Sequence, residues 1–153
     1  MKINNDMIAI RVTDNNNFER ANKIMDIYCK NASENKGVTW YSTNLPIGKD
    51  QDPPNAILFH NKKNFEFYYM VDILEIRSFE NKEIITEREI PEVYKDVPKK
   101  TWLRISNIKK IEKDVLKQYY TRDKNELLFD KLTKNKNEQI FSRIYFYKLE
   151  EEI

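Results

Sequence analysis

The strongest constraint on the fold is the run Phe65–Ile76, whose aromatic and aliphatic residues alternate with other residues from Phe65 onward. A period of two places alternate side chains on one face, so this run is predicted to be the longest strand of a sheet. Ile76 breaks the alternation, which predicts a β-bulge near Leu74. The apolar run Ala56–His60 and the turn-like Asn61–Asn64 predict an antiparallel neighbour just before it.

The remaining segments predict a sheet with few helices. Further strands are expected at Met7–Thr13, Val38–Ser42, Thr101–Ile108 and Gln139–Leu149, and helices at Phe18–Lys30, Ile111–Tyr120 and Asn125–Leu132. The acidic stretch Glu80–Glu92 has little pattern and is expected to be a surface excursion. This order has no alternating βαβ rhythm. The predicted fold class is therefore α+β, a small, curved, mostly antiparallel and barrel-like sheet with peripheral helices.

Length and composition indicate a single domain over residues 1–153, with 40% hydrophobic residues for one core. Cys29 is the only cysteine, so no intramolecular disulfide can form and a reducing cytoplasm is expected. No run approaches the roughly 18 apolar residues of a membrane span, so no membrane partner is expected. The acidic end LEEEI is compatible with a piece of a longer chain, which would add further domains or a partner subunit.

Catalytic signatures are scarce in this chain. With two glycines in all, it contains no phosphate-cradling glycine-rich loop and no GxSxG motif. His60 is the only histidine and lies in a predicted strand, where a structural role is favoured. A non-enzyme without metal or cofactor is therefore predicted. The alternative is a magnesium nuclease, in which Asp72 and Glu80 bind the ion and Lys82 orients a water molecule.

Charge is unevenly distributed along the chain. The segment Lys95–Lys117 has eight basic and three acidic residues, a net charge of +5, whereas Asp72–Glu92 has seven acidic and three basic residues, a net charge of −4. A basic segment can follow a phosphate backbone. The residues predicted to contact phosphates are Lys99, Lys100, Arg104, Lys109 and Lys110. A solvated helix and turn is the alternative interpretation of this segment.

The two tryptophans lie next to polar residues near the ends of predicted strands. Tyr41, Ser42 and Asn44 follow Trp40, and Thr101 precedes Trp102. The long loop after Ser42 is a typical position for a binding loop. Two indoles that converge on one cavity could hold a flat ligand such as an extruded base, with Tyr41, Ser42 and Asn44 beside it. The alternative is that both tryptophans belong to the core.

Several short motifs resemble the PUA-like superfamily, and within it the EVE and YTH-type domains. They are Gly37-x-x-Trp40, the strand pair AILFHN and YYMVDILEI, and Trp102-x-x-Ile105. The resemblance implies a small β-barrel with a pocket for a modified base in DNA or RNA. It also implies that Trp40 and Trp102 are cage walls and that Ser42 is a polar contact. The chain departs from the pattern where KDQDPPN replaces the usual Gly-Asp turn.

These observations together predict a nucleic-acid-binding module that recognises a methylated base, with DNA favoured over RNA as its partner. The resemblance suggests the specificity domain of a modification-dependent restriction system. A protein-interaction adaptor whose exposed aromatic residues meet another protein is the third alternative, beside the nuclease. Metal-dependent cleavage would identify the nuclease, and salt-insensitive protein binding would identify the adaptor.

Overall fold

The structure, a computed structural model of the chain, describes residues 2–12, 21–45, 47, 56–61, 66–121, 126–133 and 143–150. Its strands are β1 (Lys2–Arg11), β2 (Val38–Thr43), β3 (Ala56–Asn61), β4 (Phe67–Glu83), β5 (Lys99–Lys110), β6 (Tyr119–Thr121) and β7 (Arg143–Glu150). The α-helices are α1 (Ala21–Glu34) and α2 (Leu128–Thr133), and two short 3-10 helices are η1 (Glu92–Tyr94) and η2 (Lys113–Gln118).

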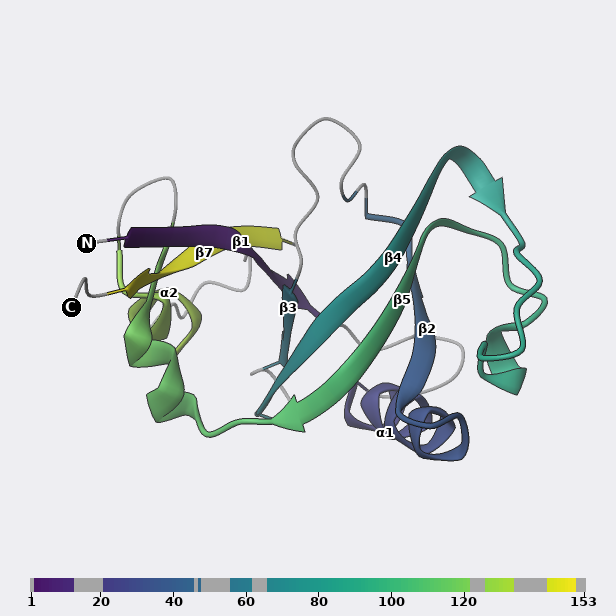
Figure 1. The fold of residues 1–153 in the computed structure, drawn as a ribbon, viewed down its shortest axis with the longest axis horizontal. Coiled ribbons are helices and arrows are strands. Elements are labelled where there is room, and N and C mark those ends of the chain that lie inside the picture. Colours follow the sequence, from purple (N-terminus) through teal and green to yellow (C-terminus); the bar gives the residue numbers. More distant parts are fainter. Residues whose placement is uncertain are drawn as a thin grey trace.

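The described strands form one sheet in the order β2-β5-β4-β3-β1-β7-β6 (Figure 1). Strands β1 and β3 are parallel, and every other neighbouring pair is antiparallel. The predicted α+β class and the mostly antiparallel sheet are thus confirmed. The sheet is open, since β2 and β6 are its two edges, so the closure expected of a barrel is not confirmed.

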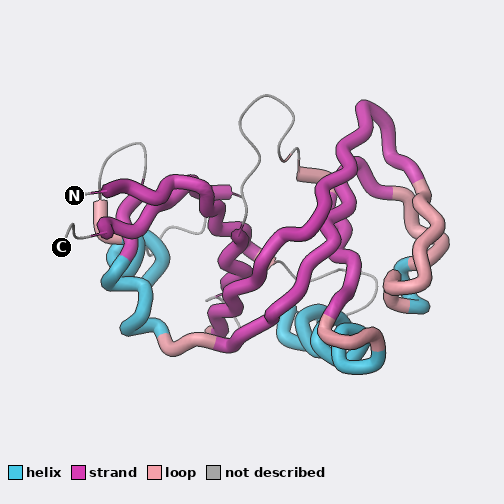
Figure 2. Tube along the Cα trace, viewed as in Figure 1, coloured by secondary structure: helices cyan, strands magenta, loops and turns pink. Residues whose placement is uncertain are grey.

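Both faces of the sheet are covered, as Figure 2 shows in outline. Helix α1 packs on one face, where its Tyr28 and Met25 join the largest core cluster with Ile10, Phe59 and Leu103. On the opposite face, η2 and α2 cover one end through a second cluster that includes Leu116, Leu128 and Phe146. The other end of that face is covered by the connection between β4 and β5, which lies far from the chain termini (Figure 1).

Strands β4 and β5 form the longest pairing in the sheet. The register between them shifts between Ile73 and Glu75, so the bulge predicted near Leu74 is confirmed. Ile76 faces the α1 side with Ile73 because the extra residue restores the alternation. Strand β4 continues to Glu83, where Glu83 pairs with Lys99. The prediction that residues from Glu80 onward leave the sheet is therefore wrong for the first four of them.

The structure corrects one predicted helix, and the start of another predicted helix lies outside the described residues. The predicted helix Ile111–Tyr120 is wrong, because the segment forms the 3-10 helix η2 and then enters β6, which pairs with β7. The predicted helix is confirmed from Ala21 to Lys30, and α1 continues beyond the predicted end to Glu34. Residues 13–20, with the predicted start of the helix, lie outside the described residues.

Gly37 sets the direction in which β2 leaves α1. Its φ of +88° lies in the left-handed region, which glycine adopts without steric cost. Its N–H donates to the carbonyl oxygen of Ala32 at 2.7 Å and so ends the helix. Strand β2 begins at the next residue and carries Trp40 into the sheet.

Candidate functional site: the tryptophan pair and its cover

Trp40 and Trp102 lie on the same face of neighbouring strands. In the register of β2 and β5, Ser42 is opposite Trp102 and Trp40 is opposite Arg104. Residues two apart on a strand point to the same side, so Trp40, Ser42 and Trp102 share one face. The structure thus brings three of the predicted base-binding residues together, on the face opposite α1.

The two indoles are covered in this structure. Their exposed fractions are 1% and 0%, and they form a small core cluster with Ile85 and Ile90 of the β4–β5 connection. We call residues 84–98 the covering segment. The indole N–H of Trp102 donates to the backbone carbonyl of Glu83 at 3.0 Å. The pair is therefore packed in an interior, and the solvent-open pocket expected from the sequence is not present.

Two polar atoms in this interior have no hydrogen-bond partner. They are Nε1 of Trp40 and Oγ of Ser42, and both are buried. Buried polar groups are nearly always hydrogen-bonded, and leaving one without a partner costs about 1–3 kcal/mol. The site accordingly combines two aromatic rings with an N–H donor and a hydroxyl group that form no well-aligned hydrogen bond, although the Trp40 indole lies near the Glu89 carboxylate and the Ser42 side chain near the Tyr28 hydroxyl.

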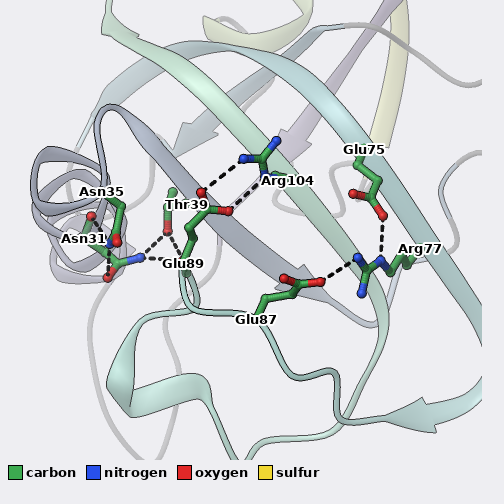
Figure 3. A network of polar contacts seen from close by, with 8 residues as sticks. All are labelled: Asn31, Asn35, Thr39, Glu75, Arg77, Glu87, Glu89 and Arg104. Carbon is green, nitrogen blue, oxygen red and sulfur yellow. Dashed lines mark hydrogen bonds and ion pairs between the residues drawn. The ribbon is translucent and has the colours of Figure 1, made fainter.

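Glu89 fastens the covering segment to the sheet (Figure 3). Its carboxylate accepts hydrogen bonds from Nε and Nη2 of Arg104 at 2.9 and 3.1 Å. Its backbone carbonyl accepts from the backbone N–H of Trp40 at 3.2 Å and from Nδ2 of Asn31 at 2.7 Å. One residue therefore connects the covering segment to β5, β2 and α1.

The charge of Glu89 is stabilised by these contacts. The hydrogen bonds from Arg104 are the main cause that lowers the pKa of the Glu89 carboxyl. Burial has a smaller effect that raises this pKa, and the nearby indole of Trp40 adds to the lowering. The indole Nε1–H of Trp40 nevertheless forms no well-aligned hydrogen bond, unlike the backbone N–H of the same residue. Glu89 remains ionised at neutral pH, as its contact with Arg104 requires.

Arg77 of β4 makes the second connection (Figure 3). Its Nε donates to Glu75 at 2.6 Å, and its Nη2 donates to Glu87 of the covering segment at 2.7 Å. Its guanidinium carbon lies 4.7 Å from the centroid of the Trp40 ring, a cation–π contact. The sequence analysis missed Arg77, Glu87 and Glu89 as site residues, because their spacing along the chain has no motif.

The other two predicted base-binding residues lie elsewhere. Tyr41 points to the α1 face, where its ring centroid is 4.8 Å from that of Tyr28 and 4.4 Å from that of Phe59. Asn44 lies beyond the end of β2 and is exposed, and its Oδ1 accepts from the backbone N–H of Lys100 at 3.3 Å. Neither residue belongs to the tryptophan cluster.

The residues predicted to contact phosphates fall into two groups on β5. Lys99 and Lys100 begin the strand, whereas Lys109 and Lys110 end it, roughly 30 Å away at about 3.3 Å per residue. None of the four has an ion-pair partner among the described residues. Burial and the charge of Lys82 lower the pKa of Lys99. Arg104 lies between the groups, bound to Glu89.

The residues of the nuclease hypothesis are dispersed. Asp72 and Glu80 are eight residues apart on β4, or roughly 26 Å, which is too far to share one ion. Asp72 accepts a hydrogen bond from Nδ2 of Asn107 at 3.1 Å. Within the described part of the chain, no three His, Cys, Asp or Glu side chains are grouped as metal ligands. The structure thus separates these residues instead of grouping them.

His60 lies in β3, opposite Tyr68 of β4. Its side chain is 4% exposed, and its Nε2 has no hydrogen-bond partner. Burial is the main cause that lowers the pKa of His60 to about 3, with a further contribution from the charge of Arg11. The imidazole is therefore neutral near pH 7, in keeping with the structural role predicted for it.

Comparison of the chain with protein-family models, with curated proteins and with solved structures finds no match. Among the described helices, none is both long and apolar enough to cross a membrane. The large hydrophobic side chains that are exposed in the described residues are Leu74, Ile84 and Val93, none of them aromatic.

Proposed function

We propose that the protein is a nucleic-acid-binding module in which Trp40 and Trp102 receive a modified base. The observation that carries this proposal is the packing of the two indoles on one face of β2 and β5, with two buried polar atoms, Nε1 of Trp40 and Oγ of Ser42, that form no well-aligned hydrogen bond. A base that stacks on an indole gains about 1–3 kcal/mol. The indole N–H and the Ser42 hydroxyl would hydrogen-bond to its polar edge and so select the base.

Entry of a base requires the covering segment to move, because Ile85 and Ile90 pack on the indoles. The site would thus be closed without nucleic acid and open in the complex. A substantial minority of complexes rearrange a loop in this way on binding. In this proposal the sheet belongs to the PUA-like group, the partner is DNA before RNA, and the module supplies specificity to a modification-dependent restriction system in the cytoplasm.

The lysines of β5 would contact the phosphate backbone on either side of the flipped base. The two groups lie roughly 30 Å apart, which corresponds to about nine nucleotides at 3.4 Å per residue of one strand. Contacts to phosphates position the nucleic acid but carry no sequence information. Base selection therefore depends on the tryptophan pair and Ser42 alone.

Ser42→Ala is the sharpest test, because it removes a hydroxyl group that makes no well-aligned hydrogen bond in the fold. We expect the thermal stability to stay the same or to rise slightly, since the unsatisfied polar atom disappears. The preference for a methylated over an unmethylated oligonucleotide should fall about fivefold to tenfold, the equivalent of one hydrogen bond. Fluorescence anisotropy with both oligonucleotides measures this preference directly.

Ser33→Ala is the matched control. The exposed hydroxyl of Ser33 donates to the backbone carbonyl of Lys30 within helix α1, and Ser33 does not belong to the tryptophan cluster. It should leave both affinities unchanged. Equal affinities of the unaltered protein for methylated and unmethylated oligonucleotides, or an unchanged preference in Ser42→Ala, would refute base recognition. Binding to a protein partner that does not respond to salt would favour the adaptor.

A further inference from the structure

Two arginines of the sheet are each held by a carboxylate of the covering segment, Arg104 by Glu89 and Arg77 by Glu87. We propose that these carboxylates are internal substitutes for phosphate, so that backbone phosphates replace them on Arg77 and Arg104 and thereby release the covering segment. The inference rests on the proposed function, since it names how the closed site opens. It also adds Arg77 to the residues that contact the nucleic acid.

The geometry of the Arg104 contact supports this exchange. Two guanidinium nitrogens bind the two oxygens of one carboxylate, at 2.9 and 3.1 Å. A guanidinium binds phosphate in the same forked manner, so a phosphate oxygen pair can take the place of the carboxylate. The side chains of Arg104 and Glu89 are 34% and 17% exposed, so an incoming phosphate reaches the arginine without unfolding the sheet.

Arg77 connects the same exchange to the aromatic rings. Its planar guanidinium lies over the face of Trp40, at 4.7 Å from the ring centroid, in the position that a stacked base would occupy. Glu87 holds it there from the covering segment. When a phosphate draws Arg77 away from Glu87, the face of Trp40 becomes available to a base at the same time.

The covering segment packs on the indoles through few apolar side chains. They are those of Ile85 and Ile90, with the partly buried Tyr94 beside them, whose ring also stacks on Tyr28 of α1 at 5.3 Å between centroids. A hollow of about 320 Å³, partly open to solvent, borders the segment and is lined by Ile85, Glu87, Ile90, Lys95 and Asp96 among others. The segment is therefore not tightly packed on every side. Its ion pairs with the sheet, made by Glu87 and Glu89, are the contacts that an anion can replace.

The test uses the double variant Glu87→Gln/Glu89→Gln, which removes both charges but keeps the shapes. Both tryptophans of the chain are in this site, so quenching of their fluorescence by acrylamide reports its opening. We expect the unaltered protein to be poorly quenched and to become more accessible as inorganic tripolyphosphate is added. The double variant should be strongly quenched without tripolyphosphate. If the open form makes up about a tenth of the unaltered protein, the double variant should bind an oligonucleotide about tenfold more tightly than the unaltered protein does.

Glu80→Gln/Glu112→Gln is the matched control, because it makes the same change in charge at two exposed residues without ion pairs among the described residues. It should be quenched like the unaltered protein. Arg104→Lys keeps the charge but loses the fork, so the response to tripolyphosphate should weaken; this variant also serves if the double variant does not fold.

Equal quenching of the double variant and the control, or an undiminished tripolyphosphate response in Arg104→Lys, would overturn the inference. Tripolyphosphate contains no base, so this result does not depend on base recognition. If tripolyphosphate opens the site while methylated and unmethylated oligonucleotides bind equally, the proposed function fails and the carboxylate exchange stands.

Discussion

Among the described residues, His60 is the group through which lowering the pH from 7 to 5 should mainly destabilise this protein. The pKa of His60 is about 3 in the folded chain. The main reason is that a protonated imidazole would be buried away from water, and the positive charge of Arg11 also repels it. In the unfolded chain the pKa is about 6.5. The unfolded state therefore binds the proton first, and the free energy of unfolding falls as the pH drops below about 6.5 and continues to fall toward about 3.

The size of the effect follows from the two pKa values. At pH 5 the unfolded histidine is about 1.5 pH units below its pKa, and each unit is worth about 1.36 kcal/mol, so the loss is about 2 kcal/mol. Carboxylates contribute little in this window. Glu89, whose pKa is lowered from 4.5 by Arg104, gives stability that is lost only as the pH falls below that ordinary value. The change in the free energy of unfolding between pH 7 and pH 5 thus reports mainly on His60.

Urea unfolding at pH 7 and pH 5 measures the effect, and His60→Gln is the comparison because it has no titrating group at this position. We expect the unaltered protein to lose about 2 kcal/mol between the two pH values and the variant to lose much less. His60 is the only histidine, so its ring signals in an NMR titration also report the native pKa without assignment. Titration of the folded protein near pH 6.5, or equal losses in both proteins, would refute the reasoning.

Two further changes separate binding from folding. Lys109→Ala/Lys110→Ala removes two exposed lysines at the end of β5, so melting should be unaffected, while the slope of log K against log salt should become shallower by roughly 0.7–0.9 for each lost phosphate contact. An unchanged slope in salt titrations would exclude both lysines from the interface. Trp102→Ala empties a fully buried position and should cost about 3–5 kcal/mol in urea unfolding. A loss below about 1 kcal/mol would contradict the packing around Trp102.

Several features followed from the sequence alone because they depend on neighbouring residues. Alternation in Phe65–Ile76 is a property of the strand itself, and its break at Ile76 predicted the bulge that the register of β4 and β5 confirms. The turn at Gly37 also has a local cause, because its φ of +88° lies in a region that glycine adopts without steric cost. Helix α1 followed from the helical spacing of Ile24, Met25 and Tyr28, which now face the core.

The tertiary structure decided what depends on partners far away in the chain. Strand β4 continues to Glu83 because β5 pairs with it, although Ser78–Glu83 has no strand pattern of its own. The parallel pairing of β1 with β3 has no signal in either strand. The site shows the same division. Trp40 and Trp102 stand out in the sequence, but their burial depends on Ile85 and Ile90 of another segment, and the contacts of Glu89 with Arg104 and Asn31 join residues 15 and 58 positions apart. A single sequence contains no record of such pairings, because they form only when the packed sheet brings the segments together.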